Sequence, residues 1–161
     1  MEVENKIPKS CKVVVIGGGV AGCSTAYHLA KYGWKDTILL ERDILTSGTT
    51  WHAAGLIGQL GSSATITKLR NYSLNLYKKL EEETGLSTGL KQNGSLTVAT
   101  TTDRLEELKR QLTFAQRFDI EAKQVSNEEI KEIYPLINTE DLVGGVFIKN
   151  DGQADPVGVA N

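Results

Sequence analysis

The chain of 161 residues is long enough for one ordinary domain, and its content of 40% hydrophobic and 24% charged residues is typical of globular proteins. The formal net charge is −2 and there is no basic run, which argues against nucleic acid and membrane surfaces as partners. Two cysteines are too few for a disulfide framework, and no apolar stretch is long enough to span a bilayer. The polar start, MEVENKIPKS, lacks the apolar region of a signal peptide, so we expect a cytoplasmic protein.

The first elements in chain order predict a βαβ unit within residues 12–42. Residues 12–16 (KVVVI) and 37–41 (TILLE) are typical of short buried strands, and residues 20–32 of a helix that ends at Gly33. A strand, a helix and a strand in so short a stretch predict a parallel pair with a right-handed crossover. We therefore expect an α/β fold that begins with a Rossmann-type unit.

The remaining elements predict part of a mixed α+β region. Residues 46–63 are rich in Gly, Ser and Thr without periodicity, and such long irregular segments are usually functional. Helical patterns cover residues 65–83, 103–118 and a short segment after a capping box at Ser126, and strand patterns cover residues 95–100, 122–125 and 143–149. The first of these helices carries apolar residues along one face, including Ile66 and Leu69.

The end of the chain resembles the opening of a helix. Asp155 is a typical N-cap, and Pro156 suits the first helical position. The sequence stops five residues later, and residues 46–161 contain no second βαβ pattern. We therefore expect a truncated chain, with further strands of the sheet beyond Asn161, and we expect these residues alone to be inactive.

Residues 17–22 (GGGVAG) fit the pattern G-x-G-x-x-G between a strand and a helix, as in dinucleotide-binding folds. Gly17 permits the tight turn, Gly19 lets the backbone approach a pyrophosphate, and Gly22 lets the helix pack close to the strand. The amides of Val20 and Ala21 open the helix, where an anion is favoured.

Glu41 ends the second strand at the position where an acidic residue binds the adenosine ribose, which disfavours a 2′-phosphate and hence NADP. Arg42 follows it and lies over the adenine or is solvated. The motif alone does not distinguish FAD from NAD, and a glycine-rich turn without a ligand is the plainest alternative. An NAD-dependent dehydrogenase would need a nicotinamide half-site in a second βαβ unit, which the sequence lacks.

Residues 46–56 (TSGTTWHAAGL) resemble the flavin-contacting segment of the sarcosine and dimethylglycine dehydrogenases, which belong to the D-amino-acid-oxidase-like FAD enzymes. Further similar motifs are LEEETG at 80–85, QNG at 92–94, YPL at 134–136, DG at 151–152 and DP at 155–156. The resemblance covers the chain from about Lys12 to its end. It implies a GR2-like FAD-binding start, with residues 1–161 as the N-terminal part of one oxidoreductase domain and 46–63 as its flavin-contacting loop.

The resemblance implies that His52 carries the flavin covalently through the 8α-methyl group of the ring. Without the resemblance, His52 reads as a solvent-facing loop histidine beside Trp51. Hydroxyls and backbone amides in this loop suit a phosphate or ribityl chain, and small residues suit backbone that passes a flat ring. The expected flavin contacts are Ser47, Gly48, Thr49, Thr50, Ala53, Ala54, Gly55 and Leu56.

The function that the resemblance implies is oxidation of an N-methyl amine such as sarcosine or dimethylglycine. The amine gives a hydride to FAD, and the resulting imine hydrolyses to release formaldehyde. The family further implies an electron-transfer flavoprotein as acceptor, tetrahydrofolate in a C-terminal domain and, in a eukaryote, the mitochondrial matrix, although no transit peptide is seen. No metal-ligand spacing is present, and no catalytic residue is assigned.

Two alternatives remain open at this point. One is an amino-acid oxidase or dehydrogenase of the same superfamily with non-covalent FAD. The other is a non-catalytic fragment that only binds a nucleotide. The state of the flavin (covalent, dissociable or absent) distinguishes these alternatives.

Overall fold

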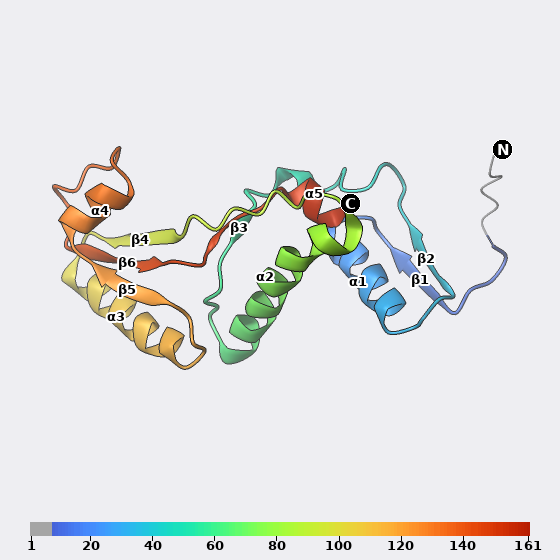
Figure 1. Ribbon diagram of the computed structural model, residues 1–161, viewed down its shortest axis with the longest axis horizontal. Coiled ribbons are helices and arrows are strands. Elements are labelled where there is room, and N and C mark those ends of the chain that lie inside the picture. The colour runs from blue at the N-terminus through green and yellow to red at the C-terminus, as the bar shows by residue number, and fades with distance from the viewer. Residues whose placement is uncertain (1–7) are drawn as a thin grey trace. The chain divides into compact units, whose positions relative to one another are not determined.

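The computed structural model describes residues 8–161, which form two units (Figure 1). The first unit combines the chain up to Ala54 with Asp155–Asn161, and the second comprises Gly55–Ala154. Most of the polar start on which the signal-peptide prediction depends, residues 1–7, lies outside the described part. In residues 8–161, every helix is too short or too polar to cross a membrane.

The first unit contains the predicted βαβ arrangement. Strand β1 (Val13–Ile16) leads into helix α1 (Val20–Lys31), which returns to strand β2 (Thr37–Leu40). The two strands pair in parallel, with Val13 opposite Thr37 and Ile16 opposite Leu40, so the Rossmann-type start is confirmed. Helix α1 ends where the sequence predicts, because Gly33 adopts a φ of +86°.

Helix α5 (Pro156–Ala160) also belongs to the first unit, where it packs against α1. Its predicted cap is confirmed, because the Asp155 carboxylate accepts a hydrogen bond of 3.0 Å from the amide of Val157. A segment more than a hundred residues downstream of α1 in the sequence therefore completes the first unit.

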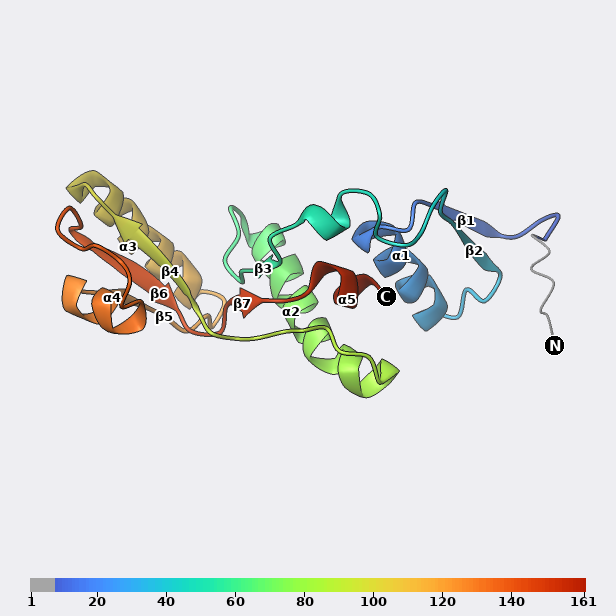
Figure 2. The same ribbon diagram turned by 90° about the horizontal axis from the view of Figure 1, so that it is seen from above.

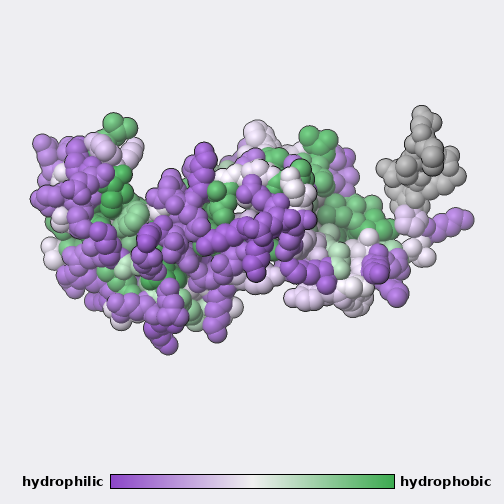
Figure 3. Space-filling view, in the orientation of Figure 1, coloured by the Kyte–Doolittle hydropathy of each residue, from purple (hydrophilic) through white to green (hydrophobic). Residues whose placement is uncertain are grey.

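The sheet of the first unit leaves apolar side chains uncovered in the described chain. Ile16 is 86% exposed, and Val14 and Leu40 are also exposed. Figure 3 shows hydrophobic atoms over the region of β1 and β2. Strands of a parallel sheet are normally covered on both faces. The further strands expected from the sequence stay a prediction.

The second unit is an α+β arrangement built on an antiparallel sheet. Its elements are β3 (Leu56–Ile57), α2 (Ala64–Thr84), β4 (Ser95–Ala99), α3 (Thr102–Gln116), β5 (Ala122–Val125), α4 (Asn127–Ile133), β6 (Gly144–Ile148) and β7 (Gly152–Gln153). Strand β6 lies between β4 and β5, and β3 pairs with β7. The two-residue strands β3 and β7 were not predicted, because they are too short to show an alternating pattern.

Helices α3 and α4 cover opposite faces of the three-stranded sheet (Figure 2). Val146 and Ile148 of β6 pack with buried residues of α3, whereas Phe147 between them packs with Ile130 of α4. This alternation follows from the two-residue period of a strand. The predicted capping box at the start of α4 is confirmed, with reciprocal hydrogen bonds between Ser126 and Glu129.

Helix α2 begins and ends close to the predicted positions, but its apolar face is only partly covered. Ile66 and Leu69 are 38% and 59% exposed, whereas Thr67 and Leu74 are buried. Ser63 caps the start by accepting from the amide of Ile66 at 3.3 Å, and Gly85 with a φ of +72° ends the helix. The helical period was therefore predicted correctly, while the face that becomes buried was not.

A buried carboxylate connects three separate segments of the second unit. Asp151 is 4% exposed, and its two carboxylate oxygens accept from the amide of Gln59 at 2.8 Å and from the hydroxyl of Ser95 at 2.6 Å. Its main-chain carbonyl accepts from the amide of Gly94 at 2.8 Å. These bonds join the end of β3, the start of β4 and the turn before β7.

Replacing Asp151 by alanine should destabilise the full-length protein by about 3 kcal/mol, since hydrogen bonds to a charged group contribute about 1.5–3 kcal/mol each. Urea unfolding followed by circular dichroism measures this change. Asp141→Ala, at an exposed position, is the matched control and should change the stability by less than about 0.5 kcal/mol. Equal effects of the two substitutions would contradict the connecting role of Asp151.

Candidate functional site: the glycine loop and the His52 segment

The glycine loop of residues 17–22 forms a tight turn between β1 and α1. Gly17 has a φ of +102°, and its amide donates to the carbonyl of Leu40 at 2.8 Å. A Cβ atom at Gly22 would collide with the carbonyl oxygen of Gly17, so a side chain is excluded at this position. Gly17 and Gly22 therefore have the roles that the motif predicts: one provides the turn and the other the close helix–strand contact.

The Glu41 carboxylate is held against the glycine loop. One oxygen accepts from the amide of Gly18 at 2.6 Å, and the other accepts from the amides of Arg42 at 2.7 Å and Asp43 at 3.1 Å. The hydrogen bond from Gly18, followed by that from Asp43, lowers the pKa of the Glu41 carboxyl below its ordinary value. Glu41 is thus an oriented anion at the end of β2, where the sequence places the ribose contact.

Lowering of the Glu41 pKa has a consequence for stability at low pH. Because the folded pKa lies below the unfolded one, Glu41 stabilises the fold above the ordinary glutamate pKa of about 4.3, and this contribution is lost as the pH falls through the lowered folded value. Glu41→Gln should therefore be less stable than wild type at pH 7, and the difference should shrink below about pH 4. Urea unfolding midpoints over a pH series test this, with Glu132→Gln as the control; a constant difference would contradict it.

Several amides of the glycine loop remain available to a ligand. Gly18 donates to Glu41 and Val20 donates to the hydroxyl of Thr50 at 3.0 Å. Among the described residues, no acceptor binds the amides of Gly19, Ala21 or Gly22. Unpaired amides at the start of a helix attract anions, so the loop fits the pyrophosphate of a dinucleotide.

The His52 segment, residues 46–54, is attached to the glycine loop at two points. The amide of Thr46 donates to the carbonyl of Gly18 at 2.9 Å, and the hydroxyl of Thr50 accepts from Val20. Thr46 is buried and has a φ of +68°, which is uncommon for a residue with a branched side chain. Thr50 opens the 3-10 helix η1 (Thr50–His52), which contacts α5.

The ring of His52 is oriented by two neighbours. Its Nδ1 lies 3.0 Å from the carbonyl oxygen of Gly48, and its ring packs against that of Trp51 at a centroid distance of 3.8 Å and an interplanar angle of 34°. The indole of Trp51 donates to the carbonyl of Ser47 at 3.0 Å. Because a carbonyl only accepts hydrogen bonds, Nδ1 carries the proton and Nε2 of neutral His52 keeps its lone pair.

The other predicted contacts divide between the two units. Ser47, Gly48, Thr49, Ala53 and Ala54 lie in the His52 segment of the first unit, and most of them are exposed. Gly55 and Leu56 belong to the second unit. Arg42 is exposed beside Glu41.

The sequence reasoning missed Thr46, which connects the segment to the glycine loop. It named Trp51 beside His52 but did not predict the contact between the two rings. The adjacent W-H pair was a usable signal for Trp51. The left-handed conformation of Thr46 has no signature in the sequence.

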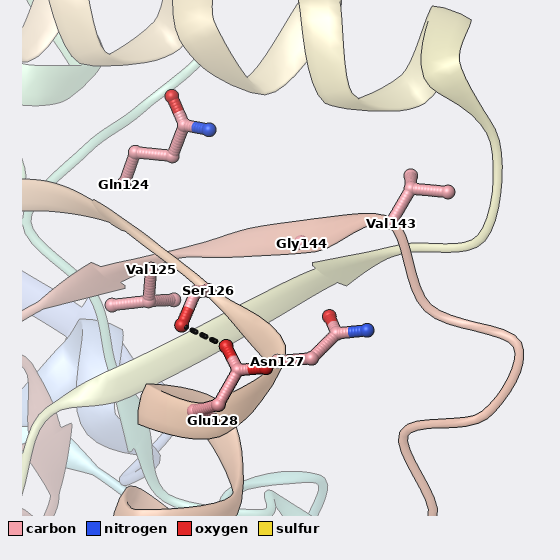
Figure 4. A pocket seen from close by; sticks show the side chains of 7 residues that line it. All are labelled: Gln124, Val125, Ser126, Asn127, Glu128, Val143 and Gly144. Atoms are coloured by element: carbon pink, nitrogen blue, oxygen red, sulfur yellow. Dashed lines mark hydrogen bonds between the residues drawn. The ribbon is translucent and has the colours of Figure 1, made fainter.

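Two depressions are notable among the described residues of the second unit. One, of about 450 Å³, lies at the start of α4, where the hydroxyl of Ser126 donates to the Glu128 carboxylate at 2.7 Å (Figure 4). Beside it, the side chain of Asn127 donates to the carbonyls of Thr139 and Leu142. The other, of about 770 Å³, is lined by residues of β3, α2 and β4 and also by Asp151, which precedes β7. Of the predicted contacts, only Leu56 lines either depression.

The chain is similar in sequence and in fold to known proteins. The pattern of the family FAD dependent oxidoreductase (DAO) matches residues 12–161. Human mitochondrial sarcosine dehydrogenase is 46% identical over 94% of the chain, and rat mitochondrial dimethylglycine dehydrogenase is 43% identical over 90%. The chain spans 17% of the length of each of these relatives. The crystal structure of L-proline dehydrogenase from P. horikoshii superposes with a TM-score of 0.88 at 30% identity, over 96% of this chain and 40% of that chain.

One similar protein is named as a regulator. The mitochondrial pyruvate dehydrogenase phosphatase regulatory subunit of mouse is 40% identical over 96% of this chain and 18% of its own length. Sequence identity of about 40% over this region is therefore shared by proteins named as dehydrogenases and by a protein named as a regulatory subunit.

Proposed function

The chain belongs to the family of FAD dependent oxidoreductases (DAO), and from this premise we propose that it is part of an FAD-dependent dehydrogenase of N-methyl amines such as sarcosine or dimethylglycine. We assign residues 1–161 to the N-terminal part of one oxidoreductase domain, with residues 46–63 as its flavin-contacting loop. The observation that carries the proposal is the attachment of the His52 segment to the glycine loop, through Thr46 and Gly18, beside the end of β2.

The glycine loop and Glu41 would hold the ADP half of FAD. The amides of Gly19 and Ala21 suit the pyrophosphate, since no described residue supplies them with an acceptor. The oriented Glu41 carboxylate suits the ribose hydroxyls, and Arg42, which follows it in the sequence, would lie over the adenine. The half-buried Ser47 and the exposed Gly48 and Thr49 remain available to the ribityl chain and the phosphates.

His52 would form the covalent bond through Nε2. Its Nδ1 proton is engaged by Gly48, which leaves the Nε2 lone pair free for the 8α carbon of the flavin. The bond would replace one 8α C–H bond: one proton would leave the methyl group and one the imidazole, and the two electrons would pass with them to dioxygen, which would become hydrogen peroxide. The small residues Ala53 and Ala54 leave room for the ring beside the backbone.

When bound, FAD supplies the hydride acceptor for the amine. The proposed products are formaldehyde and the demethylated amine. We further propose an electron-transfer flavoprotein as acceptor, tetrahydrofolate in a C-terminal domain and, because both dehydrogenases compared are mitochondrial proteins, the mitochondrial matrix as the location.

Steady-state assays of the full-length protein test this function. Sarcosine or dimethylglycine should reduce an artificial electron acceptor, and formaldehyde should form in equal amount. If neither amine nor a panel of N-methyl amines reduces the bound flavin under anaerobic conditions, the proposed activity is wrong. Turnover with flavin that is fully released by acid would favour a superfamily member with non-covalent FAD.

A second candidate function follows from the identity to the phosphatase regulatory subunit. In that case the chain would belong to a non-catalytic protein that uses the same fold for regulation. Such a protein would show no flavin reduction by any amine, even with its glycine loop occupied. The anaerobic reduction experiment therefore distinguishes the two candidates.

A further inference from the structure

Helix α1 lacks a capping side chain of its own. Its N-cap residue is Gly19, which has no side chain to accept from the first amides of the helix. The acceptor comes instead from Thr50, whose hydroxyl lies 3.0 Å from the amide of Val20. Thirty residues separate the two partners, so this cap is a tertiary contact.

Gly19 provides the space for this contact. A Cβ atom at position 19 would lie 2.9 Å from the hydroxyl oxygen of Thr50, closer than side chains normally approach. The second glycine of the motif therefore makes room for a residue of the His52 segment as well as for a ligand. Thr50 is 7% exposed, so its side chain is directed into the fold and away from solvent.

We propose that Thr50 is a positioning residue, which fixes the His52 segment against the glycine loop through its bond to Val20. The inference rests on the proposed function, because the bond between Thr50 and Val20 would hold a cofactor-binding histidine at a fixed position relative to the pyrophosphate site. Thr50 and His52 belong to the same short helix, η1, so the bond from the Val20 amide to Thr50 at one end of η1 sets the place of the imidazole at the other. The sequence predicts a direct flavin contact for Thr50; the structure assigns its hydroxyl to α1.

The attachment at Thr50 differs from that at Thr46 in one useful respect. The Thr46 contact is made by main-chain atoms and survives most substitutions, whereas the Thr50 contact depends on a hydroxyl group. Thr50→Val removes that hydroxyl at nearly constant volume, and Thr50→Ser restores it. Thr25→Val is the matched control, because it removes from α1 itself a hydroxyl that binds only the carbonyl of Ala21.

The first measurement is hydrogen–deuterium exchange in the flavin-free, full-length protein. The peptide that contains Val20 should exchange about five- to tenfold faster in Thr50→Val, the factor that corresponds to the loss of one cap hydrogen bond. Thr50→Ser and Thr25→Val should exchange at the wild-type rate there. Unchanged exchange in Thr50→Val overturns the proposal.

The second measurement is the rate at which added FAD becomes resistant to acid release. We expect attachment to be at least about tenfold slower in Thr50→Val, because a nucleophile misplaced by about 1 Å reacts far more slowly, and close to wild type in Thr50→Ser. Wild-type attachment rates in Thr50→Val, or equal slowing in the valine and serine variants, overturn the positioning role. If the wild-type protein itself releases all its flavin in acid, the assignment of His52 fails, and the exchange rates alone then decide the role of Thr50.

Discussion

Replacing His52 by alanine should move all of the flavin of the full-length protein from the acid-precipitated pellet to the supernatant. In the wild type, we expect the pellet to remain yellow and fluorescent, because the bond from Nε2 to the 8α carbon survives denaturation. The variant should still bind FAD before denaturation, since the glycine loop and Glu41 do not involve the imidazole. Absorbance of both fractions at the flavin maximum gives the measurement.

The other histidine of the chain, His28, provides the control. His28 lies on α1 and has its Nδ1 2.6 Å from the carbonyl oxygen of Ser24, away from the His52 segment in sequence. His28→Ala should retain acid-stable flavin at the wild-type level. Release of all flavin from the wild type would show that no residue carries the cofactor covalently. Retention of flavin in His52→Ala would show that another residue carries it.

Gly22→Ala should weaken FAD binding by about tenfold to a hundredfold, since overpacking against a rigid backbone costs roughly 1–3 kcal/mol. The added methyl group would meet the carbonyl oxygen of Gly17, and no side-chain rotation relieves that contact. The turn must therefore open, which would displace the amides that we propose bind the pyrophosphate. Titration of the His52→Ala form with FAD measures the affinity without interference from covalent attachment.

Gly145→Ala is the matched control for this substitution, because Gly145 lies in β6, outside the flavin-contacting loop. A Cβ atom at Gly145 would lie 2.7 Å from the carbonyl oxygen of Thr97, so this alanine also overpacks a rigid backbone. We expect its FAD affinity to stay within about twofold of the parent protein. An equal loss in both variants would mean that the change at Gly22 acts through general destabilisation.

The βαβ start and the place of Glu41 were predictable because each depends on local signals. A buried strand, a glycine turn, a helix and a second strand follow one another without interruption, and their spacing alone puts Glu41 beside the loop. The cap at Asp155 and the capping box at Ser126 are likewise encoded within four residues.

The contacts that assemble the candidate site were not predictable in the same way. The bond between Thr50 and Val20 joins residues thirty positions apart, and no local pattern specifies such a pair. The left-handed Thr46 is imposed by its surroundings, since its residue type disfavours that conformation. For α2, periodicity identified an apolar stripe, but it does not say which part of the stripe a neighbour covers.

The position of α5 has a consequence for how the chain is made. Helix α1 emerges from the ribosome well before the segment that packs on it, because Gly55–Ala154 must be synthesised in between. At roughly 5–20 residues per second, this delay is about 5–20 s. The intervening unit reduces the distance over which α5 must find α1, because its two ends are joined. The amide of Ala154 donates to the carbonyl of Gly55 at 2.9 Å, and Gln153 pairs with Leu56. When Gly55–Ala154 folds, its two ends come together, and α5 is then close in the chain to the end of the segment that precedes it. We therefore expect Gly55–Ala154 to fold first and the unit that contains α1 and α5 to fold after it.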